Sequence, residues 1–380
     1  MVQPIFIACG IDVHKEQLTL CCVNANLTEK RWYEYANNGA AITEIITLLR
    51  ELGVTKVGFE STSIYWMLLY DLLEPHFDVT LANPHQIKAI PGRKTDMRDA
   101  EWIATLLCKE LIRKSYVPSA DLRELRELCR FKASLVKEQS RYKNKQHKVL
   151  DQWNVNFTAH FSNSDTATCQ YLLDGLSNGL SWDQLVLAAP TRRITKELAK
   201  KERCVANYFQ REFSAIGRTQ LITLRRLIAC HLQEITAITL QIQQLVVQLH
   251  LEEEVERVDS IPGIGQDSAI AIVVEIGDID RFDSDDQLVS AAGLAPSVYQ
   301  SAGKNYTGHI TKRGNRHLRR ILHNCTTSIF KMPQTAFYRF YARLRKKKLP
   351  GVARVALMHK LLRVIFALLS KHEMYRPQPS

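Results

Sequence analysis

The sequence lacks long apolar runs and C-x-x-C pairs of cysteines. No apolar stretch approaches the roughly 18 residues that cross a bilayer, so we expect no membrane segment. The beginning, MVQPIFIACGIDVHK, has an apolar run too short for a signal peptide. The nine cysteines form no C-x-x-C pair, which excludes the common zinc and redox patterns and predicts reduced, mostly buried thiols. These absences predict a soluble, cytoplasmic protein.

Acidic residues are missing from one long stretch. Between Gly303 and Arg363 there are sixteen Lys or Arg and no Asp or Glu. A solvated basic face is the usual explanation for a charged run, but it does not readily account for a stretch this long. The whole chain carries 51 Lys and Arg against 39 Asp and Glu, a net charge of +12. This balance favours a polyanionic partner, and the basic stretch favours phosphate binding.

The first 115 residues alternate between strand and helix patterns. Short apolar, β-branched runs predict strands over 5–13, 17–24, 30–36, 56–60 and 78–82. Helical spacing of apolar residues predicts helices over 39–52, around 62–74 and over about 95–113. Three strands followed by alternating helices and strands predict an α/β layer fold with a mixed sheet.

The rest of the chain is predicted to be mostly helical. Leu221, Ile228, Ile235, Ile242 and Leu249 recur every seven residues, which indicates a coiled-coil seam. Its partner is either a second copy of the chain or the long basic helix predicted over 119–153. The other predicted segments are a mostly helical connector over 154–217, a compact Gly- and Ser-rich segment over 255–330, and two basic helices over 334–371. We therefore divide the chain into domains at 1–115, 116–255 and 256–380.

Four carboxylates are candidates for one metal site. Asp12 ends the first predicted strand and Glu60 ends the fourth, and open sheets bind ligands beyond their strand ends. The stretch RKTDMRDAEWIA adds Asp96 and Asp99, which lie about one helical turn apart and repel each other unless a cation lies between them. Oxygen ligands of this kind suit Mg²⁺ or Mn²⁺, and two such ions activate phosphodiesters. The basic neighbours predicted to hold a nucleic-acid backbone are Arg93, Lys94 and Arg98.

Each acid also has an ordinary interpretation. Asp96 suits the first turn of a helix, where the helix dipole favours a negative charge. Asp99 could pair with a nearby arginine, and Glu60 could cap the helix that starts near Ser61. Only their joint placement, at two strand ends and on one helix, favours metal binding.

The Gly- and Ser-rich segment contains two further candidate sites. In PGIG, Gly263 and Gly265 either let backbone N–H groups approach a phosphate or simply form a tight turn between helices. Ser301, in QSAGK, is either a solvated turn residue or a nucleophile toward phosphorus. The cations downstream that would bind phosphate are Lys304, Lys312, Arg313, Arg316, Arg319 and Arg320.

These motifs resemble a known family. GIDVHK, GFEST and KTDMRDAEWIA resemble the three acidic motifs of the DEDD transposases of bacterial insertion sequences. The resemblance implies an RNase H-like (RuvC-like) first domain in which Asp12, Glu60, Asp96 and Asp99 bind divalent metal. GLAPSVYQSAGK followed by GHITKRGNRHLRR resembles the C-terminal transposase domain of the same family. Its nucleophilic serine matches Ser301, with Ser297 as the alternative, and PGIG suggests a helix-hairpin-helix-like element.

The family implies a function and its partners. Its members cut and rejoin donor and target DNA through a transient 5′-phosphoserine, assemble as homodimers and homotetramers, and are guided by a bridge RNA. Such a protein would act at the bacterial nucleoid. Two other hypotheses are a metal-dependent Holliday-junction-type nuclease that uses water, and a non-catalytic architectural protein that binds nucleic acid.

Overall fold

The computed structural model describes residues 6–61, 64–90, 99–161, 164–209, 213–301 and 304–377. The chain divides into two compact units, Met1–Ala120 and Asp121–Ser380. Each unit contains hydrophobic cores of its own. None of the helices in the described ranges is long and apolar enough to cross a bilayer.

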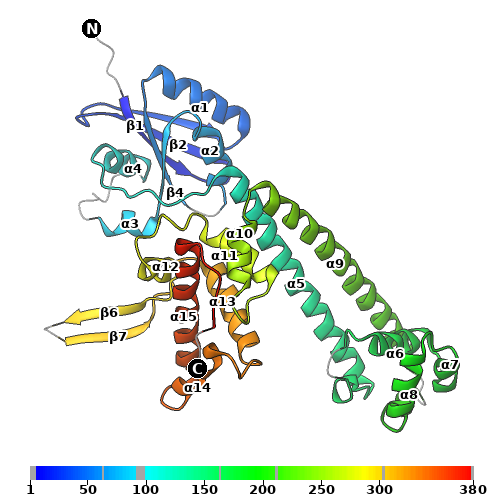
Figure 1. Cartoon of the computed structure of the whole chain (residues 1–380). Helices are drawn as coiled ribbons and strands as arrows, with labels where there is room; N and C mark the ends of the chain where they lie inside the picture. The colour runs from blue at the N-terminus through cyan, green and yellow to red at the C-terminus, as the bar shows by residue number, and fades with distance from the viewer. Residues whose placement is uncertain are drawn as a thin grey trace. The chain divides into compact units, whose positions relative to one another are not determined.

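The first unit is built on a five-stranded sheet with the order β3-β2-β1-β4-β5 (Figure 1). The strands are β1 (Phe6–Val13), β2 (Gln17–Asn24), β3 (Lys30–Ala36), β4 (Lys56–Glu60) and β5 (Asp78–Ala82). β1, β2 and β3 pair antiparallel, whereas β4 pairs parallel with both β1 and β5. The predicted mixed α/β sheet is therefore confirmed, and its arrangement is consistent with an RNase H-like fold.

Helices cover both faces of this sheet, because its strands are apolar on both sides. On one face, α1 (Gly39–Glu51) and α2 (Trp66–Leu73) share a core with Ile11 and Phe59. On the other face, α3 (Pro84–Ala89) and α4 (Asp99–Cys108) pack on Ala8 and Cys21. The helix predicted over 95–113 ends earlier, at Cys108, and residues 95–98 lie outside the described ranges.

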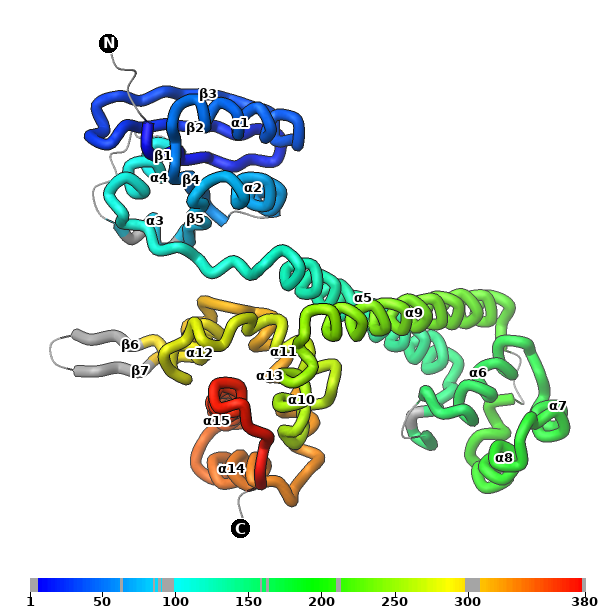
Figure 2. The backbone as a smooth tube through the Cα atoms, turned by 45° about the horizontal axis from the view of Figure 1, so that its top comes forward, coloured from blue at the N-terminus to red at the C-terminus, as the bar shows by residue number. Residues whose placement is uncertain are grey.

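The second unit contains two long helices that run side by side in opposite directions (Figure 2). They are α5 (Ala120–Gln152) and α9 (Ala215–Gln248). The amide of Gln139 donates to the carbonyl of Ile228 at 3.3 Å, and the rings of Tyr142 and His231 lie 5.2 Å apart. The heptad seam of α9 thus packs against α5 within the chain, which is one of the two alternatives that the sequence left open.

A small helical subdomain lies between α5 and α9 along the chain. It comprises η1 (Phe157–Ala159), α6 (Ala167–Asn178), α7 (Trp182–Leu187), α8 (Arg192–Val205) and η2 (Ala206–Phe209). These helices surround their own apolar core, which includes Leu172, Leu185 and Leu198. The connector predicted over 154–217 is therefore helical, as expected.

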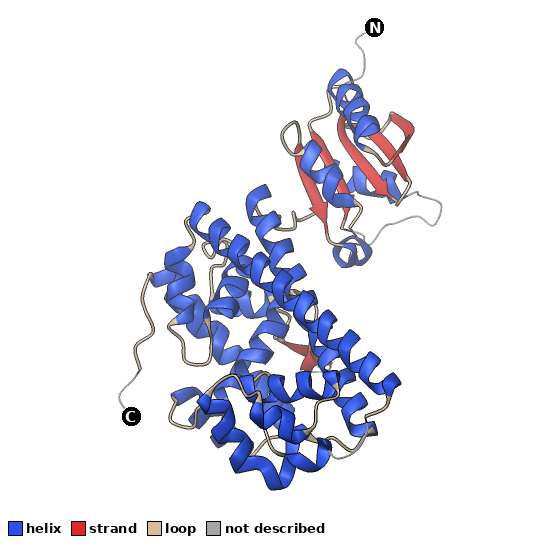
Figure 3. Ribbon diagram, turned by 90° about the vertical axis from the view of Figure 1, so that its right-hand side faces the viewer, coloured by secondary structure: helices blue, strands red, loops and turns tan. Residues whose placement is uncertain are grey.

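The remainder is mostly helical, as Figure 3 shows, and also contains a two-stranded hairpin. Its elements are α10 (Glu252–Asp259), α11 (Gln266–Ile276), α12 (Asp285–Ala291), β6 (Pro296–Ser301), β7 (Lys304–Ile310), α13 (Arg316–Ile329), α14 (Ala336–Arg345) and α15 (Pro350–Lys371). The last two agree with the two basic helices predicted over 334–371. The hairpin of β6 and β7 was not predicted, because its small and polar residues suggest turns rather than strands.

Candidate functional site

Asp12 and Glu60 lie at neighbouring strand ends. In the parallel pair of β1 and β4, Ile11 is opposite Phe59, so Asp12 and Glu60 follow at the next position. Side chains two positions apart on a strand share a face. Asp12 therefore lies on the face of Gly10, and Glu60 on the face of its neighbour Gly58.

Helix α4 covers this same face, and its backbone lies unusually close to the strands. A Cβ atom added to Gly10 would lie 2.0 Å from the carbonyl oxygen of Ala100 and 2.5 Å from the amide of Ala104. A Cβ atom added to Gly58 would meet the side chain of Leu107 at 2.7 Å. Asp99 is the first residue of α4, one position before Ala100. The glycines thus place the beginning of α4, with Asp99, against β1, in which Asp12 is the second-last residue.

Of the four predicted metal ligands, the structure describes Asp12, Glu60 and Asp99. The side chain of Asp12 is 34% exposed and its Oδ2 lies 3.1 Å from Nε2 of His14. Within the described ranges, no three acid, histidine or cysteine side chains gather closely enough to hold a metal ion. Asp96, Arg93, Lys94 and Arg98 fall in the 91–98 segment, outside those ranges. The donor chemistry, carboxylate oxygens on one sheet face, fits a hard divalent cation.

The serine candidates lie on the β6–β7 hairpin. Ser301 ends β6 and is opposite Lys304, the first residue of β7; the side chains of both lie outside the described part of the chain. Ser297 lies near the base of the hairpin, where its hydroxyl donates to the carbonyl of His309 at 2.8 Å. Ser297 therefore holds the two strands together.

Asn315, in the GHITKRGN motif, joins three helices. Its side-chain oxygen caps α13 by accepting from the amides of His317 and Leu318 at 2.9 and 3.1 Å. Its side-chain nitrogen donates to the carboxylate of Glu275 on α11 at 2.7 Å. Arg130 of α5 binds the same carboxylate in a bidentate pair at 2.8 and 2.9 Å.

Glu275 is the buried centre of this cluster, with a side chain 3% exposed. Burial alone would raise the pKa of Glu275, but hydrogen bonds from Arg130 and Asn315 outweigh burial and hold its pKa below the ordinary value. Sequence reasoning missed this cluster. The available signal was a single acid in the apolar run AIAIVVEIG, where an unpaired charge would be costly.

The predicted phosphate-binding cations divide into two groups. Arg319 is used internally, since its guanidinium donates to the carbonyl of Ala292 at 2.8 Å. Burial lowers its pKa. The exposed members, whose side chains reach solvent, are Lys312, Arg313, Arg316 and Arg320.

The two glycines of PGIG also differ: one is needed for packing inside the protein and the other is exposed. Gly263 has φ +93°, and an added Cβ would lie 2.4 Å from Ile329 of α13, so packing requires a glycine there. Gly265 is exposed, with open space around an added Cβ. Gly265 thus remains the one available for close approach of a ligand.

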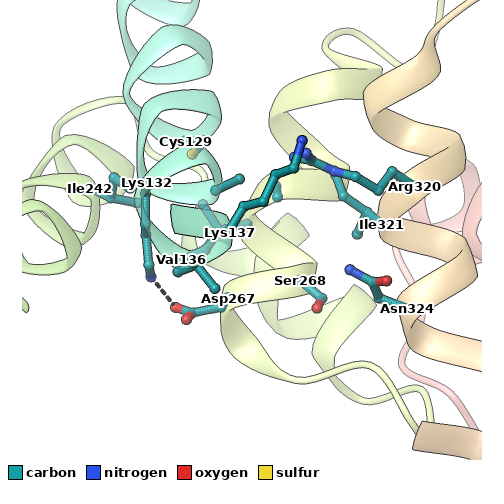
Figure 4. A pocket seen from close by; sticks show the side chains of 13 residues that line it. Cys129, Lys132, Val136, Lys137, Ile242, Asp267, Ser268, Arg320, Ile321 and Asn324 are labelled. Atoms are coloured by element: carbon teal, nitrogen blue, oxygen red, sulfur yellow. Dashed lines mark ion pairs between the residues drawn. The ribbon is translucent and has the colours of Figure 1, made fainter. Parts of the chain in front are cut away.

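A pocket lies between α5, α11 and α13 (Figure 4). It has a volume of about 380 Å³ and an apolar wall that includes Val136 and Ile242. Lys132 pairs with Asp267 at 2.8 Å on one side. On the other side the side chains of Lys137 and Arg320 converge, as Figure 4 shows. Two cations on one side of the pocket make that side favourable for an anionic group.

Comparison with known proteins gives two consistent matches. The family model for DEDD transposases of the IS110 type matches residues 9–155, and the model described as "Transposase IS116/IS110/IS902 family" matches residues 255–342. These two segments contain the sheet with its acids and the β6–β7 hairpin with Asn315.

Relatives agree with these matches. A "Probable family 20 transposase" of Pseudomonas aeruginosa is 24% identical over 88% of this chain and 89% of its own length. The "Transposase for insertion sequence element IS1111A" of Coxiella burnetii is 23% identical over 78% of this chain and 72% of its own length. A "Pilin gene-inverting protein" of Moraxella bovis is 31% identical over 36% of this chain and 44% of its own length.

The sheet, its acids and these matches define a class of protein, the enzymes that recombine DNA by phosphoryl transfer. More narrowly, the chain belongs to the IS110-type DEDD transposases of bacterial insertion sequences. Transposases of this family generally use divalent metal ions.

Proposed function

We propose that this transposase joins DNA strands through a covalent serine intermediate, assisted by divalent metal held by Asp12, Glu60, Asp96 and Asp99. The observation that carries the proposal is the placement of Asp12 and Glu60 at adjacent strand ends, on the face where α4 begins with Asp99. Bound Mg²⁺ or Mn²⁺ would neutralise the charge that develops at the phosphate. The carboxylates of this chain would hold the ion and fix its position.

Ser301 is the proposed nucleophile. Its oxygen forms a bond to phosphorus, the bond to the 3′ oxygen breaks, and the proton lost by the serine passes to the leaving 3′ oxygen, which becomes a hydroxyl. A 3′ hydroxyl of another strand then reverses the step, which frees the serine and needs no outside energy source. The hydrogen bond of Ser297 to the hairpin backbone supports Ser301 over Ser297.

The exposed cations supply contacts to the DNA and RNA backbones. Arg316 and Arg320 project from α13, and Lys312 and Arg313 precede it. Such contacts position a strand without reading its sequence. We infer that a bridge RNA paired with donor and target DNA supplies the sequence specificity, in an assembly of two or four copies.

Three variants test this proposal on one supercoiled substrate supplied with the guide RNA. Ser301→Ala should abolish both recombination and the covalent protein–DNA adduct, and Ser297→Ala should retain both. Asp99→Asn should also abolish strand cleavage while DNA affinity stays within about twofold of the parent, and removal of divalent metal should reproduce its effect.

The outcomes separate the hypotheses. Continued cutting by Ser301→Ala, without an adduct, would identify a nuclease that uses water. Activity retained by Asp99→Asn and unaffected by metal removal would refute the carboxylate site. Adduct loss in Ser297→Ala alone would transfer the nucleophile to that residue.

A further inference from the structure

The helical subdomain between α5 and α9 falls outside both family matches, which end at residue 155 and begin again at 255. Its charge distribution is uneven. No Lys or Arg occurs from residue 149 to 191, and six then follow within residues 192–203. The cations of this region are therefore concentrated on one helix, α8.

Helix α8 presents most of these cations on one face. At about 100° per residue, Arg192, Lys196, Lys200 and Arg203 fall within an arc of about 80°. The side chains of Ile194, Leu198 and Val205 are buried on the opposite side of the helix, in the core of the subdomain. The four cations are all exposed and point away from that core.

Two other charged residues of α8 have partners inside the subdomain. Lys201 donates to the carbonyl of His160 and lies 4.0 Å from the ring centre of Phe161. Glu197 accepts from the hydroxyl of Thr168 and lies 3.7 Å from the guanidinium of Arg193. By contrast, none of the four outward cations has an acidic partner among the residues that the structure describes.

We propose that this outward face of α8 (Arg192, Lys196, Lys200 and Arg203) binds the phosphate backbone of a nucleic-acid duplex. The four cations extend along about 16 Å of helix, and a duplex strand carries one charge per about 3.4 Å of its axis, so several phosphates lie within reach. Ala199 and Thr195 are small exposed residues beside the cations, which lets a backbone approach closely. This inference takes one thing from the proposed function, namely that the protein has a nucleic-acid partner.

The test measures binding of the full-length chain to a 30-base-pair DNA duplex and to an RNA duplex of equal length, across a salt titration. Replacing all four cations with glutamine should make the slope of log affinity against log salt shallower by about 0.9 per lost DNA contact, or about 3.6 in total. Loss on DNA alone, on RNA alone or on both would support the face and identify its polymer. An unchanged slope on both duplexes would overturn the proposal.

A matched pair of double variants controls for overall charge. Lys196→Gln with Lys200→Gln removes two face cations, whereas Arg141→Gln with Arg193→Gln removes two exposed cations that have acidic partners. The first pair should lose about two contacts and the second almost none. Equal losses in both pairs would mean that only net charge matters and would overturn the proposal.

Two further measurements keep the result interpretable. All these side chains are exposed, so the thermal unfolding midpoint should stay unchanged; if the fourfold variant unfolds, the double variant carries the test. Ser301→Ala should bind both duplexes like the parent. Suppose that Ser301→Ala loses strand joining and that the α8 variants bind both duplexes normally. That result would refute the α8 face and leave the proposed chemistry intact.

Discussion

At the scale of single residues, Glu275 shows how the C-terminal unit places its basic helix. Its carboxylate is buried and receives hydrogen bonds from Arg130 and Asn315, and Asn315 in turn caps α13. Glu275 therefore helps to fix the beginning of α13, the helix that carries the exposed Arg316 and Arg320, which we propose to bind phosphate.

Replacing Glu275 with glutamine should destabilise the protein by about 3 kcal/mol, because it leaves the guanidinium of Arg130 without its buried carboxylate. Urea unfolding at neutral pH would measure the change. Glu127→Gln is the control, since Glu127 pairs with the same arginine at 3.0 Å but is 53% exposed. That variant should change stability by less than about 1 kcal/mol. Similar losses in the two variants would contradict the central role of Glu275.

The sequence could not predict this cluster. Arg130 and Asn315 lie 145 and 40 positions from Glu275, and no local pattern joins residues so far apart. Asp12 and Glu60 were different, because an acid at the end of an apolar strand has few places to lie. Their adjacency follows from the parallel pairing of β1 and β4, which the alternation of strands and helices had indicated.

At the scale of whole elements, the position of α4 depends on two glycines. Gly10 and Gly58 remove the side chains that would otherwise separate α4 from the sheet. The sequence showed both glycines inside predicted strands but gave no reason for them. The reason is the close approach of a helix, which only the structure shows.

Gly10→Ala should therefore displace α4 and the aspartate at its start. The new methyl group would lie 2.0 Å from a backbone oxygen that cannot move without the helix. We expect a loss of stability of roughly 1–3 kcal/mol and a loss of strand cleavage. Gly39→Ala is the control, because open space surrounds its added methyl group, and it should keep both properties. Full cleavage by Gly10→Ala would show that the placement of α4 does not matter for the chemistry.

At the scale of the whole molecule, the buried Glu275 and the half-buried His317 and His359 should make the protein sensitive to acid. Burial is the main cause that lowers the pKa of His317 and of His359, so each takes up a proton at a lower pH in the native state than in the unfolded chain. Hydrogen bonds to Arg130 and Asn315 overcome burial and lower the pKa of Glu275, so the native state keeps it charged. In each case the unfolded chain takes up protons first as the pH falls.

Stability should therefore be complete above about pH 6.5, fall as the histidines of the unfolded chain protonate, and fall again below about pH 4.5. Urea unfolding midpoints at pH 7.5, 5.5 and 4.0 would measure both steps. His317→Gln should reduce the first step and leave the second. A stability that rises between pH 7.5 and 5.5 would contradict this assignment.

The two chain segments that connect the subdomain of α6, α7 and α8 to α5 and α9 are in contact with each other. Trp153 follows α5 and Phe213 precedes α9, and their rings lie 5.3 Å apart. A segment inserted between two such fixed points can change in length or be exchanged without moving either neighbour. The chain between these two points can therefore vary in length or sequence while α5 and α9 keep their places.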